Sequence, residues 1–486
     1  MTLEQTKTPF SELDHLEDSN DGSRTIPDES PVHIDAAEEK KLLWKIDRRL
    51  VTITGLGYCM CLMDRGNLSA ASIAGMTTDL GLEGNNRYSI ILLVFFIPYV
   101  LFQAPMTLLT RKVGARLFLS TITLLWAGLL VGMGFVKEWD QLAGCRVILG
   151  ALEAGYFPGA VYLLTCWYCR YEIQQRVAVF YIFGCLSSAA GGILAYGLMQ
   201  IGGAGGLRGW RWILIVEGLI TSVIALLSYI FLVDFPDMAA KSWNFLTDRE
   251  SMHVIWRINK DREDVTPEPF NLTKYLACGK DLKIWAFAMI FLVTNVVNYS
   301  ILYFLPIILK DGMGFSTAAA QCLVAPPYAF TAFWMYMTAW VGDRYRVRGP
   351  IIVFNCLACI IGLPIMSLAK LSGVRYFGVF LVTAGSNSNT PCAVAYQANN
   401  IRGQWKRAFS SASLIAAGGI GGIISSVAYR AQDAPTYRPG IWTSFAFNCL
   451  NVAVVAILTL YFRHCNRKAD AGSLVIEGLE SFRYTI

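Results

Sequence analysis

Long apolar stretches recur along the whole chain, and they constrain its fold more than any other feature. Hydrophobic residues make up 55% of the sequence and charged residues only 16%, which is unlike a soluble globular domain. The sequence therefore predicts an all-α, multi-pass protein of the lipid bilayer with about twelve transmembrane helices, because each stretch of about 20 residues can cross roughly 30 Å of hydrocarbon. The stretches begin near Leu50, Tyr88, Arg116, Gln141, Val177, Trp212, Ile284, Ala320, Pro350, Arg375, Ala408 and Ile441.

Lysine and arginine gather in one set of short loops, which gives the expected orientation. They precede the first stretch, follow the second, fourth, eighth and tenth, and close the last, so we expect both termini to be cytoplasmic. The first forty residues are polar and acidic, so no cleavable secretory signal is expected. The expected organisation is an N-terminal tail (1–48), a six-helix half (49–233), a cytoplasmic linker (234–282), a second six-helix half (283–463) and a C-terminal tail (464–486).

The fourth apolar stretch contains two ionisable residues, Arg146 and Glu153. Seven residues are two helical turns, so both are expected on one face, roughly 10 Å apart. An ionisable group at membrane depth is normally tolerated only beside a partner or a water-filled cavity. This pattern indicates a transporter.

The first stretch adds Asp64, Arg65 and Asn67. An arginine at membrane depth suits a carboxylate ligand, because its planar donors match two oxygens and its charge is permanent. The alternative is structural: Asp64 would neutralise Arg65 or Arg146 and hold helices together.

The candidates for a proton-coupling residue follow by elimination. All four histidines lie in the tails or the linker, so the intramembrane carboxylates Glu153, Asp64 and Glu217 remain. Glu153 beside an arginine is the first candidate. Packing of Glu217 against Arg211 is the alternative for that residue.

Uncharged polar residues mark other faces that we expect to line a cavity. Asn295, Asn298 and Tyr299 form one stripe in the seventh stretch, and Asn387 lies in a polar run of the tenth. Tyr156 and Tyr328 could stack on a flat ligand, although ordinary helix packing is the alternative for each. The two Cys-x-x-Cys pairs have no further ligands nearby, so no metal site is expected.

The two halves echo each other, because the basic loop 111–116 has a counterpart at 342–349. Such repeats are typical of secondary transporters, with the substrate site between the halves. The twelve stretches and the paired loops resemble the major facilitator superfamily. More narrowly, the chain resembles the fungal allantoate and nicotinate permeases of the anion:cation symporter family in these segments: Asp64 to Asn67, Arg146 to Gly159, Trp167-Tyr168 with Glu172 and Arg176, Gly209 to Trp212, and Pro435 to Gly440.

The resemblance implies roles for particular residues. Arg65 and Arg146 would bind the anion and Glu153 would couple to protons, while Arg111, Arg116, Asp343 and Arg344 would belong to gating loops. One departure concerns those loops, because the first lacks the aspartate that the second keeps as Asp343.

These observations predict proton-coupled uptake of a small organic anion by alternating access, the anion being a monocarboxylate such as nicotinate or allantoate. We expect a monomer in the plasma membrane, with no nucleic-acid partner and no cofactor other than protons. The absence of a Gly-Pro pair from the fifth stretch favours uptake over export. An exporter of an organic anion and a non-transporting nutrient receptor are the alternatives, and an enzyme is the least expected.

Overall fold

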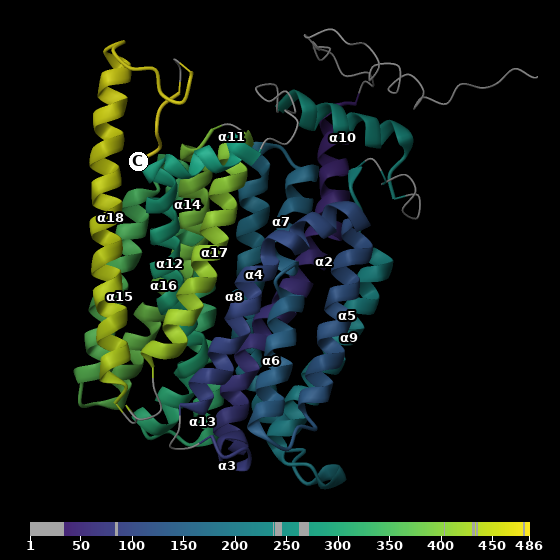
Figure 1. Ribbon diagram of the computed structural model, residues 1–486, viewed down its shortest axis with the longest axis vertical. Helices are drawn as coiled ribbons and strands as arrows, with labels where there is room; N and C mark the ends of the chain where they lie inside the picture. Colours follow the sequence, from purple (N-terminus) through teal and green to yellow (C-terminus); the bar gives the residue numbers. More distant parts are fainter. Residues whose placement is uncertain are drawn as a thin grey trace, which may run out of the picture.

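The computed structural model describes residues 34–486, apart from 83–85, 237, 239–244, 262–271, 403, 430–432, 434–435 and 480–481. The acidic run of the N-terminal tail therefore lies outside the described residues. Two helical bundles stand side by side, the N-terminal half in purple to blue and the C-terminal half in green to yellow (Figure 1). The membrane-spanning elements of the first half are α2 (Ala36–Ala71), α4 (Arg87–Val113), α5 (Ala115–Met133), α6 (Trp139–Glu153), α7 (Tyr156–Trp167), α8 (Arg170–Met199) and α9 (Gly209–Phe231).

The second half repeats this arrangement. Its elements are α12 (Leu282–Ile307), the short α13 (Thr317–Cys322) followed by α14 (Ala325–Tyr345), α15 (Gly349–Leu368), α16 (Ser372–Asn400), α17 (Gln404–Ala428) and α18 (Arg438–Asp470). Within the described residues, nine helical segments are long and apolar enough to cross a membrane. Helices α2, α14 and α16 are not among the nine, and two of them contain polar runs, around Asp64 in α2 and Asn387 in α16.

The fourth predicted span crosses as one segment, Trp139–Trp167, but its helix is interrupted for two residues. Helix α6 ends at Glu153, and α7 begins at Tyr156 after a turn at Ala154 and Gly155. Pro158 has no N–H to donate to the carbonyl of residue 154, which favours a break there. A side chain at Gly155 would place its Cβ 2.9 Å from the Cβ of Met106, so glycine also permits close packing against α4. The break leaves Glu153 in the last turn of α6.

Helices extend beyond the predicted boundaries at the linker end of the molecule. Helix α2 begins 13 residues before position 49, at Ala36, and α18 runs seven residues past 463, to Asp470. The last turn of α18 contains Arg467 and Lys468, whose charges favour a helix C-terminus. The linker contains a helix, α10 (Asp248–Asp261), which an ion pair between Glu250 and Lys45 holds against α2. The C-terminal end of the chain lies at this same end (Figure 1).

The two halves are joined at the opposite end, which we call the distal gate. Helix α2 packs against α12, α4 against α17, and α8 against α14. Hydrogen bonds cross the boundary from Gln321 Nε2 to the Ala70 carbonyl at 3.3 Å and from Lys310 Nζ to the Ile73 carbonyl at 3.0 Å. The distal gate is closed in this structure. In the first half it comprises residues 66–73, residues 88–100 and Gly192 of α8, and in the second half residues 302–329 and 419–429.

Candidate functional site

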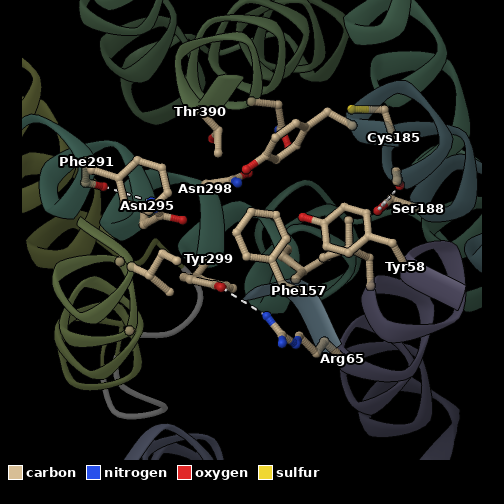
Figure 2. Close-up of a pocket in the computed structure, with 18 of the residues that line it drawn as sticks. Tyr58, Arg65, Phe157, Cys185, Ser188, Phe291, Asn295, Asn298, Tyr299 and Thr390 are labelled. Atoms are coloured by element: carbon tan, nitrogen blue, oxygen red, sulfur yellow. Dashed lines mark hydrogen bonds between the residues drawn. The ribbon is translucent and has the colours of Figure 1, made fainter. Parts of the chain in front are cut away.

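Arg65 on α2 and Glu153 at the end of α6 form a buried ion pair. The Nε to Oε2 distance is 2.7 Å, and the side chains are only 3% and 0% exposed. The Nη1 atom of Arg65 also donates to the hydroxyl of Tyr299 on α12, at 3.1 Å (Figure 2). The thiol of Cys61 contacts the same Glu153 oxygen at 3.2 Å. One arginine therefore connects three helices and both halves of the molecule.

A second arginine, Arg146, contacts the same aromatic ring as Arg65, that of Phe95. The Cζ atom of Arg65 is 5.3 Å from the ring centroid of Phe95, and the Cζ atom of Arg146 is 4.8 Å from the same centroid. Such contacts stabilise a cation in apolar surroundings. Arg146 is fully buried, and none of its three guanidinium nitrogens has a hydrogen-bond partner among the described residues. Glu153 therefore pairs with Arg65 and not with the arginine two turns before it.

The charges of this cluster do not cancel, because two guanidinium groups share one carboxylate. Arg65 Nη2 and all three Arg146 nitrogens make no hydrogen bond of normal geometry with the described residues, and the groups that face the two guanidinium groups from Tyr99 and Tyr303 are neutral hydroxyls. A buried cation without a counter-ion is costly, and arginine forms its strongest hydrogen bonds with carboxylates. The cluster is thus electrostatically suited to receive an anion.

A cavity of about 70 Å³ lies between the halves beside Arg65, with room for several water molecules or the polar group of a small ligand. Six of the predicted site residues line it: Arg65, Asn295, Asn298, Tyr299, Tyr328 and Asn387. Aromatic side chains that the sequence analysis did not single out, among them Tyr58 and Phe157, form the facing wall (Figure 2). Tyr58 is held in place by stacking on Phe180, with ring centroids 4.2 Å apart.

The cavity wall does not include the six other predicted binding and proton-coupling residues, of which Asp64 and Glu217 are described below. Arg146 and Glu153 lie one layer behind it, and Asn67 lines a neighbouring cavity. Tyr156 donates its hydroxyl to the Thr54 carbonyl at 3.1 Å and packs edge-on against Trp126. These contacts agree with the alternative that Tyr156 packs between helices and does not stack on a ligand.

Asp64 pairs with neither arginine, so the interpretation that it neutralises Arg65 or Arg146 is wrong. Its carboxylate instead accepts hydrogen bonds from Trp126 Nε1 at 3.1 Å and Thr221 Oγ1 at 3.2 Å. The reason is helix rotation: consecutive residues 64 and 65 point about 100° apart, so they face different neighbours.

Glu217 does not pack against Arg211, which corrects the second structural alternative. Arg211 lies 3.6 Å from Asp79 and donates to the Val136 carbonyl at 2.7 Å. Both carboxyl oxygens of Glu217 are buried with no hydrogen-bond partner in the described chain, and the amide of Asn67 faces them.

The predicted gating loops lie at the linker end. Asp343 forms an ion pair with Arg348. In the first loop, Gly114 has a φ of 95°, and Arg111 and Arg116 flank it at the ends of α4 and α5. A carboxylate from outside this loop, that of Asp234, accepts a hydrogen bond from the Ala115 N–H at 2.9 Å.

Sequence reasoning missed Asp234 because it lies 119 residues from its partner along the chain. The only signal would have been that an acid at the end of the sixth span can cap the N-terminus of another helix. Phe95, Trp126 and Thr221 gave no signal, since such residues are common throughout apolar spans.

Comparisons with known proteins agree with this architecture. Residues 54–426 match the family model described as Major Facilitator Superfamily. The chain is 30% identical over 459 residues to the major facilitator-type transporter hxnP of Emericella nidulans, covering 93% of this chain and 91% of that protein. It is 31% identical over 435 residues to the high-affinity nicotinic acid transporter of Saccharomyces cerevisiae, covering 89% and 80%.

Solved structures share the fold at low identity. The xylose transporter XylE of E. coli in a partially occluded inward-open conformation superposes with a TM-score of 0.64 at 13% identity, covering 85% of this chain and 98% of that one. A bacterial homologue of the human lysosomal transporter Spinster, inward-facing and unoccupied, gives a TM-score of 0.66 at 13% identity, covering 85% and 97%.

Proposed function

The chain belongs to the major facilitator superfamily, and we propose that within this family of transporters it imports a small organic anion together with protons. The observation that supports this proposal is the cluster of Arg65, Arg146 and Glu153, with its excess positive charge and unpartnered donors beside a cavity between the halves. We further propose that it belongs to the allantoate and nicotinate permease group of anion:cation symporters.

The ion pair suggests how anion and proton would be coupled. While Glu153 is ionised, it occupies the Nε donor of Arg65. Protonation of Glu153 would neutralise it and release that donor, so that Arg65 could hold a substrate carboxylate with two parallel hydrogen bonds. When the substrate leaves, Arg65 would recapture Glu153, which must lose its proton to become a carboxylate again. Anion and proton would therefore bind and leave together.

The walls of the cavity favour a small planar monocarboxylate. Among the residues that line the cavity, Arg65 is the cationic one, and the rings of Tyr58, Phe157 and Tyr299 offer stacking surfaces around it. The similarity to a nicotinic acid transporter makes nicotinate the first substrate to test. We propose a monomer in the plasma membrane. Both termini would be cytoplasmic, and the distribution of lysine and arginine among the loops agrees with this orientation.

Uptake of labelled nicotinate in cells that express the full chain tests the proposal. We expect saturable uptake that is faster at acidic external pH and is inhibited by an excess of competing monocarboxylates. Nicotinamide, which has the same ring but no negative charge, is the matched competitor and should inhibit poorly. Equal inhibition by the acid and the amide would contradict an arginine-based anion site.

A further inference from the structure

A second cavity, of about 40 Å³, lies between the substrate cavity and the distal gate. Its polar walls come from five helices: Asn67 on α2, Ser187 and Ser188 on α8, Glu217 on α9, Gln321 on α13 and Tyr328 on α14. Leu62, Ser188, Leu302 and Tyr328 belong to both cavities and separate them. We call this second cavity the gate chamber.

The gate chamber is surrounded by unsatisfied polar atoms. Six buried atoms on its walls make no hydrogen bond of normal geometry within the described protein: both amide atoms of Asn67, the two Glu217 carboxyl oxygens that this amide faces, the Oε1 of Gln321 and the hydroxyl of Tyr328. Buried polar groups are normally satisfied, and a polar cavity of this size accommodates about two or three water molecules. The chamber is therefore suited to hold water in contact with Glu217.

No cation compensates Glu217 in the described structure. The elements packed against α9 are α2, α5, α8 and the short helix that follows α2 at 72–76. Helix α2 brings Asp64, which is bonded to Trp126, and Arg65, which is committed to Glu153. The charged residues of α5 and α8 lie in their first two turns, at the linker end, and 72–76 contains none. An ionised carboxylate that is 1% exposed and unpaired is strongly unfavourable, whereas a protonated one is not.

The chamber exists only while the distal gate is closed, because the two halves contribute opposite walls. Asn67 and Glu217 belong to the first half, and Gln321 and Tyr328 to the second. Gln321 also bonds to the Ala70 carbonyl at the gate itself. Separation of the halves at this end would split the chamber and expose Glu217 to bulk water, which stabilises its ionised form.

We propose that Glu217 is a gate-linked proton site, at which a proton taken up from the distal side permits the distal gate to close. This inference rests on the proposed proton coupling but places a proton outside the Arg65–Glu153 pair. Closure dehydrates Glu217, so closure and protonation stabilise each other. Protonation of Glu153 in the ion pair would then be coupled to binding of the anion. Protonation of Glu217 in the gate chamber would be coupled to closure of the distal gate.

The accessibility of a gate cysteine tests this inference without any substrate. Ala70 is 6% exposed at the closed gate, so Ala70→Cys should react with a membrane-impermeant maleimide only when the gate opens. The nearby Cys322 is replaced by serine in the background chain. Because maleimides attack the thiolate, each labelling rate is divided by the rate of free cysteine at the same pH. As the external pH falls from about 8 to about 5, this ratio should fall, by at most about tenfold per pH unit for one linked proton. Glu217→Gln, which resembles the protonated acid, should label slowly at every pH.

Two control variants test whether the pH dependence of labelling arises from Glu217. Ser228→Ala, at a buried position on the same helix, and Glu153→Gln, in the ion pair, should both keep the pH dependence of labelling. A Glu217→Gln chain that retains this dependence would overturn the inference, and so would its loss in Glu153→Gln alone. If the pH-dependent labelling is present but no carboxylate is taken up, the proposed function fails and the inference stands.

A measurement on the unmutated protein removes the risk that Glu217→Gln fails to fold. Dicyclohexylcarbodiimide reacts with protonated carboxyl groups in apolar surroundings, and mass spectrometry identifies the modified residue. We expect modification of Glu217 to be several-fold faster at acidic pH, because protonation and burial occur together. Modification at a rate independent of pH, or none at Glu217, would overturn the inference.

Discussion

At the scale of single residues, Arg65 has the central position, because it is bonded to Glu153 in its own half and to Tyr299 in the other. Glu153 depends on it in turn, since its described contacts are with Arg65 and Cys61. A buried pair of this kind is costly to break from one side only. Variants of Arg65 and Glu153 can therefore separate the effect of the pair on stability from the effect of Arg65 on substrate binding.

Arg65→Gln should destabilise the protein by about 3–5 kcal/mol, because it leaves an uncompensated carboxylate in the interior. The double variant Arg65→Gln with Glu153→Gln removes both charges and should recover most of that loss. It should nevertheless bind no labelled carboxylate. Thermal unfolding and ligand binding of the purified variants measure both effects. A double variant as unstable as the single one would show that the charge of Arg65 stabilises the fold through other groups.

Glu153→Gln alone should abolish uphill uptake while exchange of internal for external substrate partly survives. Glutamine resembles the protonated acid and cannot release a proton, so the variant stays in the substrate-binding form. Uptake and exchange are measured in the same vesicles, with and without an inward proton gradient. Accumulation driven by external acid in this variant would place the coupling proton elsewhere, with Asp64 and Glu217 as the remaining candidates.

At the scale of elements, the distal gate depends on helices that approach with little space between them. A Cβ added at Gly192 on α8 would lie 2.4 Å from the carbonyl oxygen of Gln321 in the other half. Backbone cannot move aside as a side chain can, so a larger residue at this position holds the halves apart.

Gly192→Ala should therefore oppose closure of the distal gate and lower the uptake rate roughly tenfold, since overpacking of a tight contact costs about 1–3 kcal/mol. Gly197→Ala on the same helix is the matched control, because no atom lies within 4 Å of its added Cβ. Initial uptake rates, normalised to the amount of protein in the membrane, make the comparison. Equal rates would mean that α8 and α13 separate easily.

At the scale of the whole molecule, the C-terminal segment fastens the linker end of the second half. Glu477 accepts hydrogen bonds from Lys283 on α12 and Lys406 on α17. Asn400 on α16 exchanges two hydrogen bonds with the backbone of Thr485, at 2.8 and 3.1 Å. Burial by itself would raise the pKa of Glu477, but the hydrogen bonds from the two lysines outweigh it and hold that pKa below its usual value.

This shift predicts how stability depends on pH. A carboxylate whose pKa is lower in the folded state contributes stability above its unfolded pKa of about 4.3, and this stability is lost as pH falls through the folded pKa. Glu477→Gln should thus lower the unfolding temperature at neutral pH, and its difference from the unmutated chain should shrink below about pH 4. Asp470→Asn, which removes an exposed pair with Arg483, is the control and should change little. Equal unfolding temperatures for Glu477→Gln and the unmutated chain at neutral pH would show that the segment does not stabilise the bundle.

Hydropathy and loop charge are local properties of the chain, so they were sufficient to predict a helical membrane protein, and the motifs that resemble the major facilitator superfamily predicted its fold. The sequence also identified Arg65, Arg146, Glu153, Asp64 and Glu217, since any charge in an apolar span needs a reason. The pairing of these charges could not be predicted: Glu153 meets Arg65, 88 residues away, and not Arg146 on its own helix. Which side chains meet depends on the rotation of each helix about its axis and on its position along the membrane normal. Both depend on packing between helices that are distant in the sequence. The same reason explains the break after Glu153, the hydrogen bond that Asp234 accepts from the Ala115 N–H, and the gate chamber around Glu217.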